Sequence, residues 1–479
     1  LFRARIPVLL MAGRSPHTLR GELPGSRDTY VHFVQDPFDQ ASLVRPYVKW
    51  EYSLPTGVIA KEALRRAHTL MQSDPKGPVY LMLPRETLAE SWDANAVHPF
   101  PESRYGPVAA GGADPDVVAA LAGRLLAARE PVLITAYAGR NPASVALLDE
   151  LARFAGIRVF EFNPLHLNIP HDSPCFAGFA PGKHVAQADF GMLVDIDVPW
   201  IPRDMPDNPA TWWAHIDVDA VKRGFPMWGF PSNLRIEGDS SRILAQLLEA
   251  LRARATPAFV AGARRRVAAL AAEHRQRMEG VARLAADKGA PGRINPQYLC
   301  AELGRAIAPD DIVVNEAIRN GPAVFSQVPR SKPGTLIGLA GGGLGFSGGM
   351  ALGMKLAQPG RTVLQIVGDG SFYFCNPEAV YAVAAQYRLP IFTVVLDNGG
   401  WAAVKEATLR MHPEGEAKRL GAYASQLAQG MAFAKIGEAA GAYGETLTEP
   451  AEAAAAIRRC LDEVRGGRSA VLHVHIGPH

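Results

Sequence analysis

Short apolar runs alternate with segments of helical hydrophobic spacing along the whole chain of 479 residues. Short apolar runs bounded by turn residues predict buried strands, and apolar positions that recur every three to four residues predict helices. The alternation falls into three stretches, residues 1–107, 108–290 and 291–479. It predicts an α/β fold with three doubly wound domains, each built on a parallel sheet.

The first stretch predicts few elements. Strands are expected at Ile6–Ala12 and Pro78–Leu83, with a helix at Gly57–Met71 between them. The segment Pro84–Val108 is rich in Pro, Asp, Glu and Ser and lacks periodicity, which predicts a linker. The chain begins with Leu1 rather than Met, and we expect that its front end is missing.

The second and third stretches predict a regular succession of strands and helices. In the second, the expected helices are Val117–Ala128, Ala143–Phe154, Arg242–Leu251 and the long Pro257–Lys288, and the expected strands are Pro131–Thr135, Arg158–Phe162, Phe190–Ile196 and Trp213–Val218. In the third, the expected helices are Gln297–Ile307, Pro377–Tyr387, Phe433–Tyr443 and Pro450–Glu463, and the expected strands are Ile312–Asn315, Thr362–Val367, Ile391–Leu396 and Ala470–His475. A glycine-rich segment, Ala340–Met354, runs into a further helix.

Composition and charge exclude several classes of protein. Hydrophobic residues make up 48% of the chain and charged residues 20%, which excludes a disordered chain. The net charge is +3 without a long basic run, so neither nucleic acid nor a membrane is expected as a partner. The apolar run near the start predicts a buried strand rather than a signal peptide, because no small-residue cleavage site follows it.

The cysteines and histidines offer little candidate chemistry. Four cysteines lie far apart without a C-x-x-C pair: Cys175, Cys300, Cys375 and Cys460. This predicts neither a disulfide framework nor a zinc site, and it favours a reducing compartment, the cytoplasm. His473 and His475 alternate on one strand face, but we expect no metal there because no third ligand type accompanies them. For His184 and His215 we expect structural roles.

The most informative segments are GDGSFYF, residues 368–374, and LDNGGW, residues 396–401. Asp369 follows one predicted strand, and Asn398 follows the next. Because ligands of open α/β sheets bind beyond the carboxyl ends of the strands, these two side chains are expected to lie close together. A carboxylate, an amide oxygen and nearby carbonyls suit Mg²⁺, which completes its octahedron with phosphate oxygens and water.

Small residues beside this predicted metal site suit a phosphate. Gly368 and Gly370 let a phosphate approach the backbone closely, and Ser371 adds a hydroxyl donor. The sequence therefore predicts a metal-bridged diphosphate. The alternative interpretation of the GDG segment alone is a glycine turn with a capping Asp.

These segments together resemble the signature of the thiamine-diphosphate-dependent enzymes, in which GDG is followed, one helix and one strand later, by paired asparagines. This chain has Asp397 at the first position of the pair and retains Asn398 at the second. The resemblance implies that Asp369, Asn398 and the Gly400 carbonyl are the Mg²⁺ ligands. It places Gly368, Gly370 and Ser371 on the diphosphate.

The segment AGGGLGFSGGMALG, residues 340–353, resembles the glycine-rich turn that precedes this motif in the family. The resemblance implies that Leu344 supports the bent conformation of the cofactor and that the Gly342 carbonyl contacts the aminopyrimidine. Further candidates follow two predicted strands: Arg319 and Asn320 for the diphosphate, and Trp401, Val404 and Glu406 for the substrate channel.

The resemblance covers essentially the whole chain. It implies the back part of a pyrimidine-binding domain at 1–107, a central Rossmann-like domain with a linker helix at 108–290, and a diphosphate-binding domain at 291–479. The segment AYAGRNP, residues 136–142, is not G-x-G-x-x-G, so NAD is not expected. Residues 163–178 do not resemble the flavin-contacting stretch of acetolactate synthases, so FAD is not expected either, although this difference does not exclude it.

The resemblance is to acetolactate synthases and benzoylformate decarboxylases. It implies decarboxylation of a 2-oxo acid, or carboligation to a 2-hydroxy ketone or acetohydroxy acid, by a homo-oligomer (a dimer or tetramer) with its active sites between subunits. In the family an activating glutamate lies in the front part of the pyrimidine-binding domain, and no counterpart precedes Ile6. One alternative is therefore a cofactor-binding but catalytically impaired remnant or regulatory subunit. Another is a nicotinamide or flavin oxidoreductase that uses the central domain.

Overall fold

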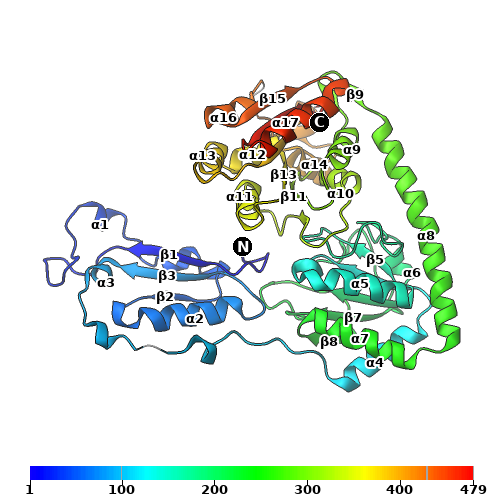
Figure 1. The fold of residues 1–479 in the computed structure, drawn as a ribbon, viewed down its shortest axis with the longest axis horizontal. Coiled ribbons are helices and arrows are strands. Elements are labelled where there is room, and N and C mark those ends of the chain that lie inside the picture. The colour runs from blue at the N-terminus through cyan, green and yellow to red at the C-terminus, as the bar shows by residue number, and fades with distance from the viewer. Residues whose placement is uncertain (99, 428–429, 478–479) are drawn as a thin grey trace. The chain divides into compact units, whose positions relative to one another are not determined.

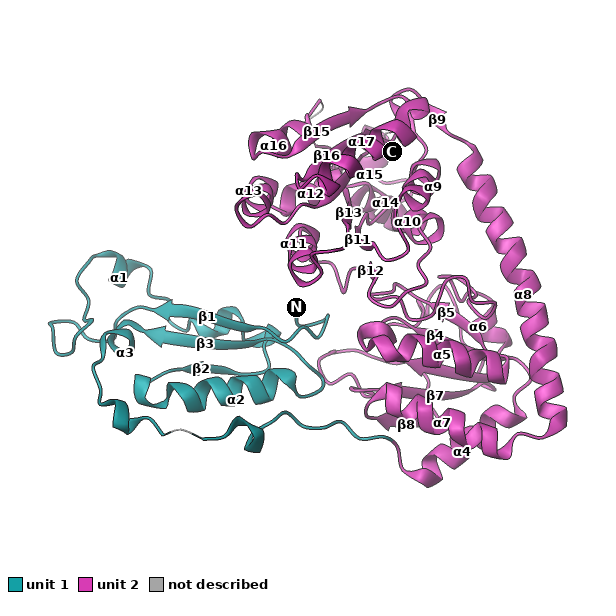
Figure 2. Cartoon of the chain, viewed as in Figure 1, with its two compact units in different colours: residues 1–112 teal, residues 113–479 magenta. Residues whose placement is uncertain are grey.

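A computed structural model describes residues 1–98, 100–427 and 430–477. The chain forms two compact units, residues 1–112 and residues 113–479 (Figure 2). Both units contain parallel sheets with helices packed on them, so the predicted α/β class is confirmed. The three domain boundaries inferred from the sequence stay a prediction. No helix within the described ranges is long and apolar enough to cross a membrane.

The first unit contains a three-stranded parallel sheet in the order β1-β3-β2. Its strands are β1 (Leu9–Arg14), β2 (Glu51–Ser53) and β3 (Val79–Pro84), and helix α2 (Ala60–Gln72) packs against it. Strand β1 begins later than the expected Ile6. The expected linker is wrong at its start, because α3 (Arg85–Ala89) follows β3 directly and the Glu86 carboxylate accepts hydrogen bonds from the backbone of His17 and Thr18 at 2.9 Å.

The second unit contains two parallel sheets. The central sheet has the order β5-β4-β6-β7-β8. Its strands are β4 (Pro131–Thr135), β5 (Arg158–Glu161), β6 (Phe190–Val194), β7 (Trp212–Asp217) and β8 (Leu234–Glu237), and its main helices are α4 (Pro115–Ala127), α5 (Pro142–Ala155) and α7 (Ser240–Arg254). Strand β8 was not predicted, because it is a short edge strand with a single buried side chain, Ile236.

The long helix α8 (Pro257–Ala286) connects the two sheets of this unit (Figure 1). It packs against α5 and, toward its end, against α9 (Pro296–Ala306) and α10 (Gly321–Gln327). Pro257 starts the helix at a position where its missing N–H is not needed, and the Thr256 hydroxyl caps the Phe259 N–H.

The C-terminal sheet of the second unit has six parallel strands in the order β12-β11-β13-β14-β16-β15. They are β11 (Ile312–Glu316), β12 (Leu336–Ile337), β13 (Val363–Gly368), β14 (Phe392–Asp397), β15 (Tyr443–Leu447) and β16 (Ala470–His475). Helices α11 (Ser347–Ala357), α13 (Pro377–Tyr387), α16 (Phe433–Ala439) and α17 (Ala453–Arg465) surround it. The expected helix Phe433–Tyr443 is wrong at its end: the positive φ of Gly441 (90°) stops it, and Tyr443 begins β15.

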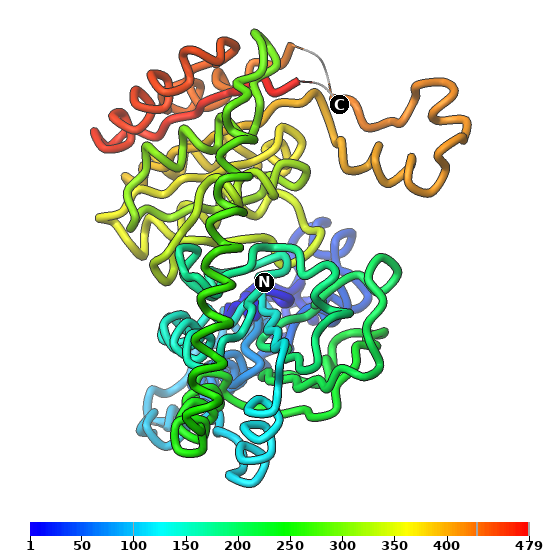
Figure 3. Tube along the Cα trace, turned by 90° about the vertical axis from the view of Figure 1, so that its right-hand side faces the viewer, coloured from blue at the N-terminus to red at the C-terminus, as the bar shows by residue number. Residues whose placement is uncertain are grey.

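Four segments of the C-terminal sheet's connections form helices that the sequence analysis left out, and α10, between β11 and β12, is the first of them. Part of the GDG motif is itself a short helix, α12 (Asp369–Phe374). After β14 the chain forms α14 (Ala402–Met411) and α15 (Glu416–Leu420), which extend away from the sheet as the orange arm in Figure 3.

Candidate active site

The carboxyl ends of neighbouring strands bring the candidate residues to one edge of the C-terminal sheet. The parallel register places Glu316 of β11 opposite Val367, and Gly368 opposite Leu396. Asp369 and Asn398 are the residues that follow β13 and β14. Their predicted proximity thus follows from the pairing of these two strands.

Asp369 is almost completely buried at the start of α12. Its Oδ1 atom accepts a hydrogen bond from the Gly370 N–H at 2.9 Å, whereas the buried Oδ2 atom has no hydrogen-bond partner among the described residues. Burial and the neighbouring Asp397 carboxylate raise the pKa of Asp369 to about 7. An unpartnered carboxylate oxygen held in this way is suited to a cation.

Asp397 has a hydrogen-bonded partner in β16. Its Oδ2 atom lies 2.8 Å from His473 Nε2, and its Oδ1 atom accepts from the Gly399 N–H at 2.9 Å. Burial acts to raise the pKa of Asp397, but its interactions with His473, the Gly399 N–H and Asp369 together hold the pKa below its ordinary value. The charged Asp in place of the first paired asparagine is therefore matched by a histidine on the neighbouring strand.

The expectation that no third ligand type accompanies His473 and His475 is wrong. The register of β14 and β16 places Asp397 opposite His475, and one ligand atom from each of the three side chains lies within 4.8 Å of the others. The sequence concealed this group because Asp397 is distant along the chain. The two histidines for which structural roles were expected lie in the central part of the chain. His215 is fully buried and stacks on Trp228, and His184 packs against Phe160.

The loop after β14 carries the other two predicted ligands, Asn398 and Gly400. The Asn398 Oδ1 atom accepts from the Gly400 N–H at 3.2 Å, and Asn398 is half-buried. The Gly400 N–H also interacts with the Asp369 carboxylate and helps to lower its pKa. Gly399 (φ 83°) needs the left-handed backbone region that glycine adopts readily.

Trp401 covers the start of α12. A Cβ atom on Gly370 would lie 2.1 Å from the Nε1 atom of Trp401. This Nε1 atom is buried and has no hydrogen-bond partner among the described residues. The Trp401 ring also packs against Phe374 at 5.9 Å between centroids. Trp401 thus lies against the GDG segment, while Val404, on α14, is half exposed.

Glu316 is a buried acidic residue that the sequence analysis did not select. Its carboxylate accepts hydrogen bonds from the backbone N–H groups of Gly345 and Ser347, the latter at 3.0 Å, and so holds the end of the glycine-rich turn where α11 begins. Burial raises the pKa of Glu316, and these hydrogen bonds partly oppose the shift. Its position at the end of a predicted strand was a usable signal, the same one that selected Asp369.

The two glycine-rich-turn candidates lie just before this anchored point. Gly342 is exposed and Leu344 is half-buried. Both belong to the segment between β12 and α11, which starts from the strand beside β11. The Glu316 carboxylate therefore positions the segment that carries them.

Arg319 and Glu406 form an ion pair between the end of β11 and helix α14. Both side chains are more than two-fifths exposed, at 45% and 41%. Asn320 precedes α10 without capping it. Because Glu406 engages the Arg319 guanidinium, a contact of Arg319 with a diphosphate would require it to leave or share this pair.

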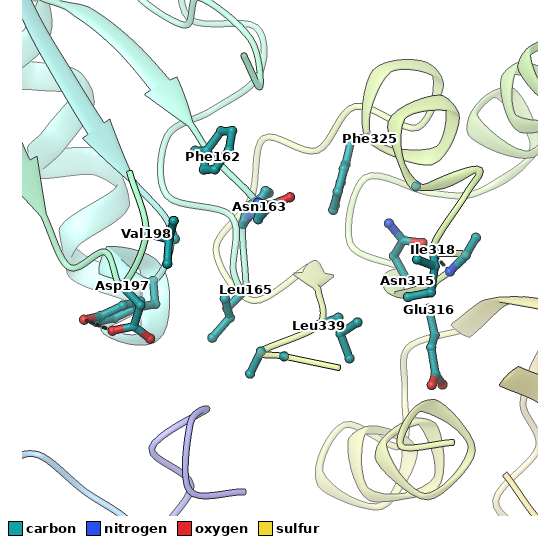
Figure 4. Close-up of a pocket in the computed structure, with 17 residues that line it drawn as sticks. Phe162, Asn163, Leu165, Asp197, Val198, Asn315, Glu316, Ile318, Phe325 and Leu339 are labelled. Atoms are coloured by element: carbon teal, nitrogen blue, oxygen red, sulfur yellow. Dashed lines mark hydrogen bonds between the residues drawn. The ribbon is translucent and has the colours of Figure 1, made fainter. Parts of the chain in front are cut away.

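A cavity of about 340 Å³ lies within the second unit, between the carboxyl-end loops of the central sheet and those of β11 and β12 (Figure 4). Phe162, Leu165 and Phe325 give it an apolar wall, and Asn315 and Asp197 add polar groups. Glu316 also borders it, but its carboxylate is directed away from Phe162 and Leu165 (Figure 4).

A buried lysine, Lys222, forms an ion pair with Asp197 at the border of this cavity. Lys222 Nζ donates to the Asp197 carboxylate at 2.9 Å, to the Asp217 carboxylate at 2.6 Å and to the Tyr137 hydroxyl at 2.7 Å. Lys222 and Asp217 are both almost fully buried. These four side chains come from the loops after β4, β6 and β7 and from the end of β7 itself, so one cation joins three strands of the central sheet.

The C-terminal part of the chain, which carries the candidate site, is similar to a known protein family. Residues 322–474 match the family described as "Thiamine pyrophosphate enzyme, C-terminal TPP binding domain", thiamine pyrophosphate being another name for thiamine diphosphate. This range contains every residue predicted to bind the metal or the diphosphate except Arg319 and Asn320. The resemblance of this chain to the superfamily of thiamine-diphosphate-dependent enzymes is thereby confirmed.

Individual proteins of this superfamily are similar to different lengths of this chain. Benzoylformate decarboxylase of Pseudomonas aeruginosa is 27% identical over 417 residues, which are 83% of this chain and 70% of that protein. Acetolactate synthase isozyme 3 large subunit of Escherichia coli is 28% identical over 185 residues, 38% of this chain and 31% of that subunit. A thiamine diphosphate-dependent 4-hydroxybenzoylformate decarboxylase of Rhodococcus jostii shares the fold, with a TM-score of 0.77 at 20% identity over 100% of this chain and 84% of that one.

The residues at the sheet edge fit a thiamine-diphosphate site in this chain. Asp369 offers an unpartnered buried carboxylate oxygen, and Asn398 and Gly400 offer neutral oxygens in the adjoining loop. Such a hard-oxygen set suits Mg²⁺ with a diphosphate. The ligand roles themselves remain predictions.

Replacing Gly370 by alanine is expected to weaken Mg²⁺-dependent binding of thiamine diphosphate about tenfold or more. The new Cβ atom would lie 2.1 Å from Trp401 Nε1, so the indole and the loop behind the predicted ligands must shift. Calorimetric titration with the cofactor measures the effect. Gly353→Ala is the control, because no atom lies within 4 Å of its added Cβ; equal affinities for the two variants would contradict the assignment.

Proposed function

We propose that this protein is a thiamine-diphosphate- and Mg²⁺-dependent enzyme that decarboxylates a 2-oxo acid, and that it can also join the product to a second carbonyl compound to form a 2-hydroxy ketone or acetohydroxy acid. The observation that carries the proposal is the buried Asp369 carboxylate, whose Oδ2 atom lacks a partner among the described residues beside the Asn398 loop. Relatives named for decarboxylation of 2-oxo acids and for acetolactate synthesis support the reaction class.

In this proposal the chain binds and positions the cofactor. Asp369, Asn398 and the Gly400 carbonyl would hold Mg²⁺, while Gly368, Gly370 and Ser371 would contact the diphosphate. When bound, thiamine diphosphate would supply the electron sink that decarboxylation of a 2-oxo acid needs.

The remaining contacts concern the other end of the cofactor. The Gly342 carbonyl would contact the aminopyrimidine, and Leu344 would support the bent conformation of the cofactor. Glu316 fixes the turn that carries both residues. In the proposed organisation, residues 291–479 form the diphosphate-binding domain, residues 108–290 the central domain and residues 1–107 part of the pyrimidine-binding domain.

We also propose a homo-oligomer, at least a dimer and commonly a tetramer, because members of the family form their active sites between subunits. Light scattering at micromolar concentration tests this, and a monomer would contradict it. The four buried, unpaired cysteines support a reducing compartment, so we expect the enzyme in the cytoplasm.

The full chain loaded with Mg²⁺ and thiamine diphosphate, incubated with a panel of 2-oxo acids that includes pyruvate and benzoylformate, tests the function directly. We expect CO₂ release with at least one acid and its loss when Mg²⁺ is chelated. Hydrogen–deuterium exchange at C2 of the bound cofactor separates an enzyme from a catalytically impaired remnant: exchange no faster than in free cofactor would favour the remnant.

A further inference from the structure

The group formed by Asp397, His473 and His475 lies beside the predicted Mg²⁺ ligands but has a different chemistry. His473 and His475 occupy alternate positions of β16 and so face the same side of the sheet, and Asp397 is opposite His475 in β14. The two imidazole rings are 4.7 Å apart between centroids. Two neighbouring strands thus present two imidazoles and one carboxylate to a common point.

The burial of these side chains suits a bound ion. His473 is 1% exposed and its Nδ1 atom has no hydrogen-bond partner among the described residues, while its Nε2 atom faces the Asp397 carboxylate. Phe433 packs edge-on against the His473 ring at 5.0 Å between centroids. Asp397 and His475 are only half-buried, so an ion can reach the group from solvent.

We propose that Asp397, His473 and His475 form a second metal site, one for a borderline divalent ion such as Zn²⁺, distinct from the Mg²⁺ site of the proposed function. One ligand atom from each residue already lies within 4.8 Å of the others, and small side-chain movements bring them to coordination distance. Two histidines and one carboxylate are a ligand set of known zinc sites, in which water fills the fourth position. The oxygen-only set of Asp369, Asn398 and Gly400 favours Mg²⁺ instead.

Zinc titration of the metal-free full chain, without thiamine diphosphate or Mg²⁺, tests this proposal by calorimetry. We expect one Zn²⁺ per chain. His475→Asn removes one imidazole ligand, and Asp397→Asn replaces the carboxylate by a neutral and weaker amide oxygen. We expect each to weaken Zn²⁺ binding about 100-fold or more. The control His412→Asn changes an exposed histidine at the end of α14 and is expected to leave the affinity unchanged.

A fourth variant separates the second site from the Mg²⁺ site. Asp369→Asn is expected to retain Zn²⁺ binding while losing Mg²⁺-dependent cofactor binding. Zinc affinity that survives in His475→Asn, or that is lost in Asp369→Asn, would overturn the proposal. If the ligand variants do not fold, Co²⁺ added to the unmodified chain decides: histidine coordination gives visible absorption bands, and a spectrum identical to that of aqueous Co²⁺ would refute the site.

Discussion

Asp369→Ala and Asp369→Asn are both expected to abolish Mg²⁺-dependent binding of thiamine diphosphate, with a loss of affinity of about 100-fold or more. Each variant removes the buried carboxylate oxygen that has no other partner among the described residues, while the asparagine keeps the size of the side chain. Calorimetric titration with the cofactor, with and without Mg²⁺, measures the change. Asp310→Asn is the control, since Asp310 is exposed and pairs only with Lys332 among the contacts described for its side chain. Unchanged binding in either Asp369 variant would refute the metal assignment.

The substitution Asp369→Asn is also expected to stabilise the cofactor-free protein. The folded chain holds the pKa of Asp369 at about 7, above the ordinary 3.8, chiefly by burial. The folded state therefore binds this proton more tightly than the unfolded state, and stability falls as the pH rises from about 4 to about 7. Asp369→Asn removes this penalty, which is on the order of 4 kcal/mol at pH 8. Urea unfolding at pH 5 and pH 8 measures it, and a gain that is no larger at pH 8 would contradict the assigned shift.

Glu316→Ala is expected to impair both stability and cofactor binding. It leaves the Gly345 and Ser347 N–H groups without their carboxylate acceptor, at a cost on the order of 3 kcal/mol in the free energy of unfolding. The released turn carries Gly342 and Leu344, so we expect cofactor affinity to fall about 30-fold through lost preorganisation. Glu316→Gln keeps one acceptor oxygen and is expected to recover most of the stability.

Two measurements separate these effects. Urea unfolding reports the stability of the cofactor-free chain, and calorimetry reports cofactor affinity under conditions in which each variant is folded. Glu414→Ala, which removes a largely exposed carboxylate paired with Lys418, is the control. If Glu316→Ala bound the cofactor as tightly as the unmodified chain, Glu316 would have no part in positioning the turn.

The strand-end rule explains what the sequence could reveal of this site. Asp369 and Asn398 were found because each follows a strongly apolar strand within a recognisable motif, and the parallel pairing of β13 with β14 then brings them together. Glu316 obeys the same rule but lies outside the recognised motif. The pairing of Asp397 with His473 depends on the neighbour relation of β14 and β16, which skips β15 in the sheet order and which local patterns do not encode.

Local sequence patterns also explain why some helices were predicted wrongly or missed. Helix α16 was extended to Tyr443 because the apolar spacing continues past Gly441, whose positive φ ends the helix. Helix α12 was not predicted because two glycines lower the helix propensity of the GDG segment, and tertiary packing of Phe372 overrides that preference. The long helices, by contrast, carry their own start signals: α5 and α8 both begin with proline after a capping residue.

The buried Lys222 bears on what the edge of the central sheet can recognise. In open α/β sheets, nucleotides are held by exposed N–H groups and cations beyond the carboxyl ends of the strands. Here Lys222 is engaged from within by Asp197, Asp217 and Tyr137. An incoming phosphate would have to compete with two carboxylates for this ammonium group and would meet their repulsion. The positive charge of Lys222 is thus neutralised within the protein. The cavity beside it is therefore better suited to a neutral or apolar ligand than to an anion.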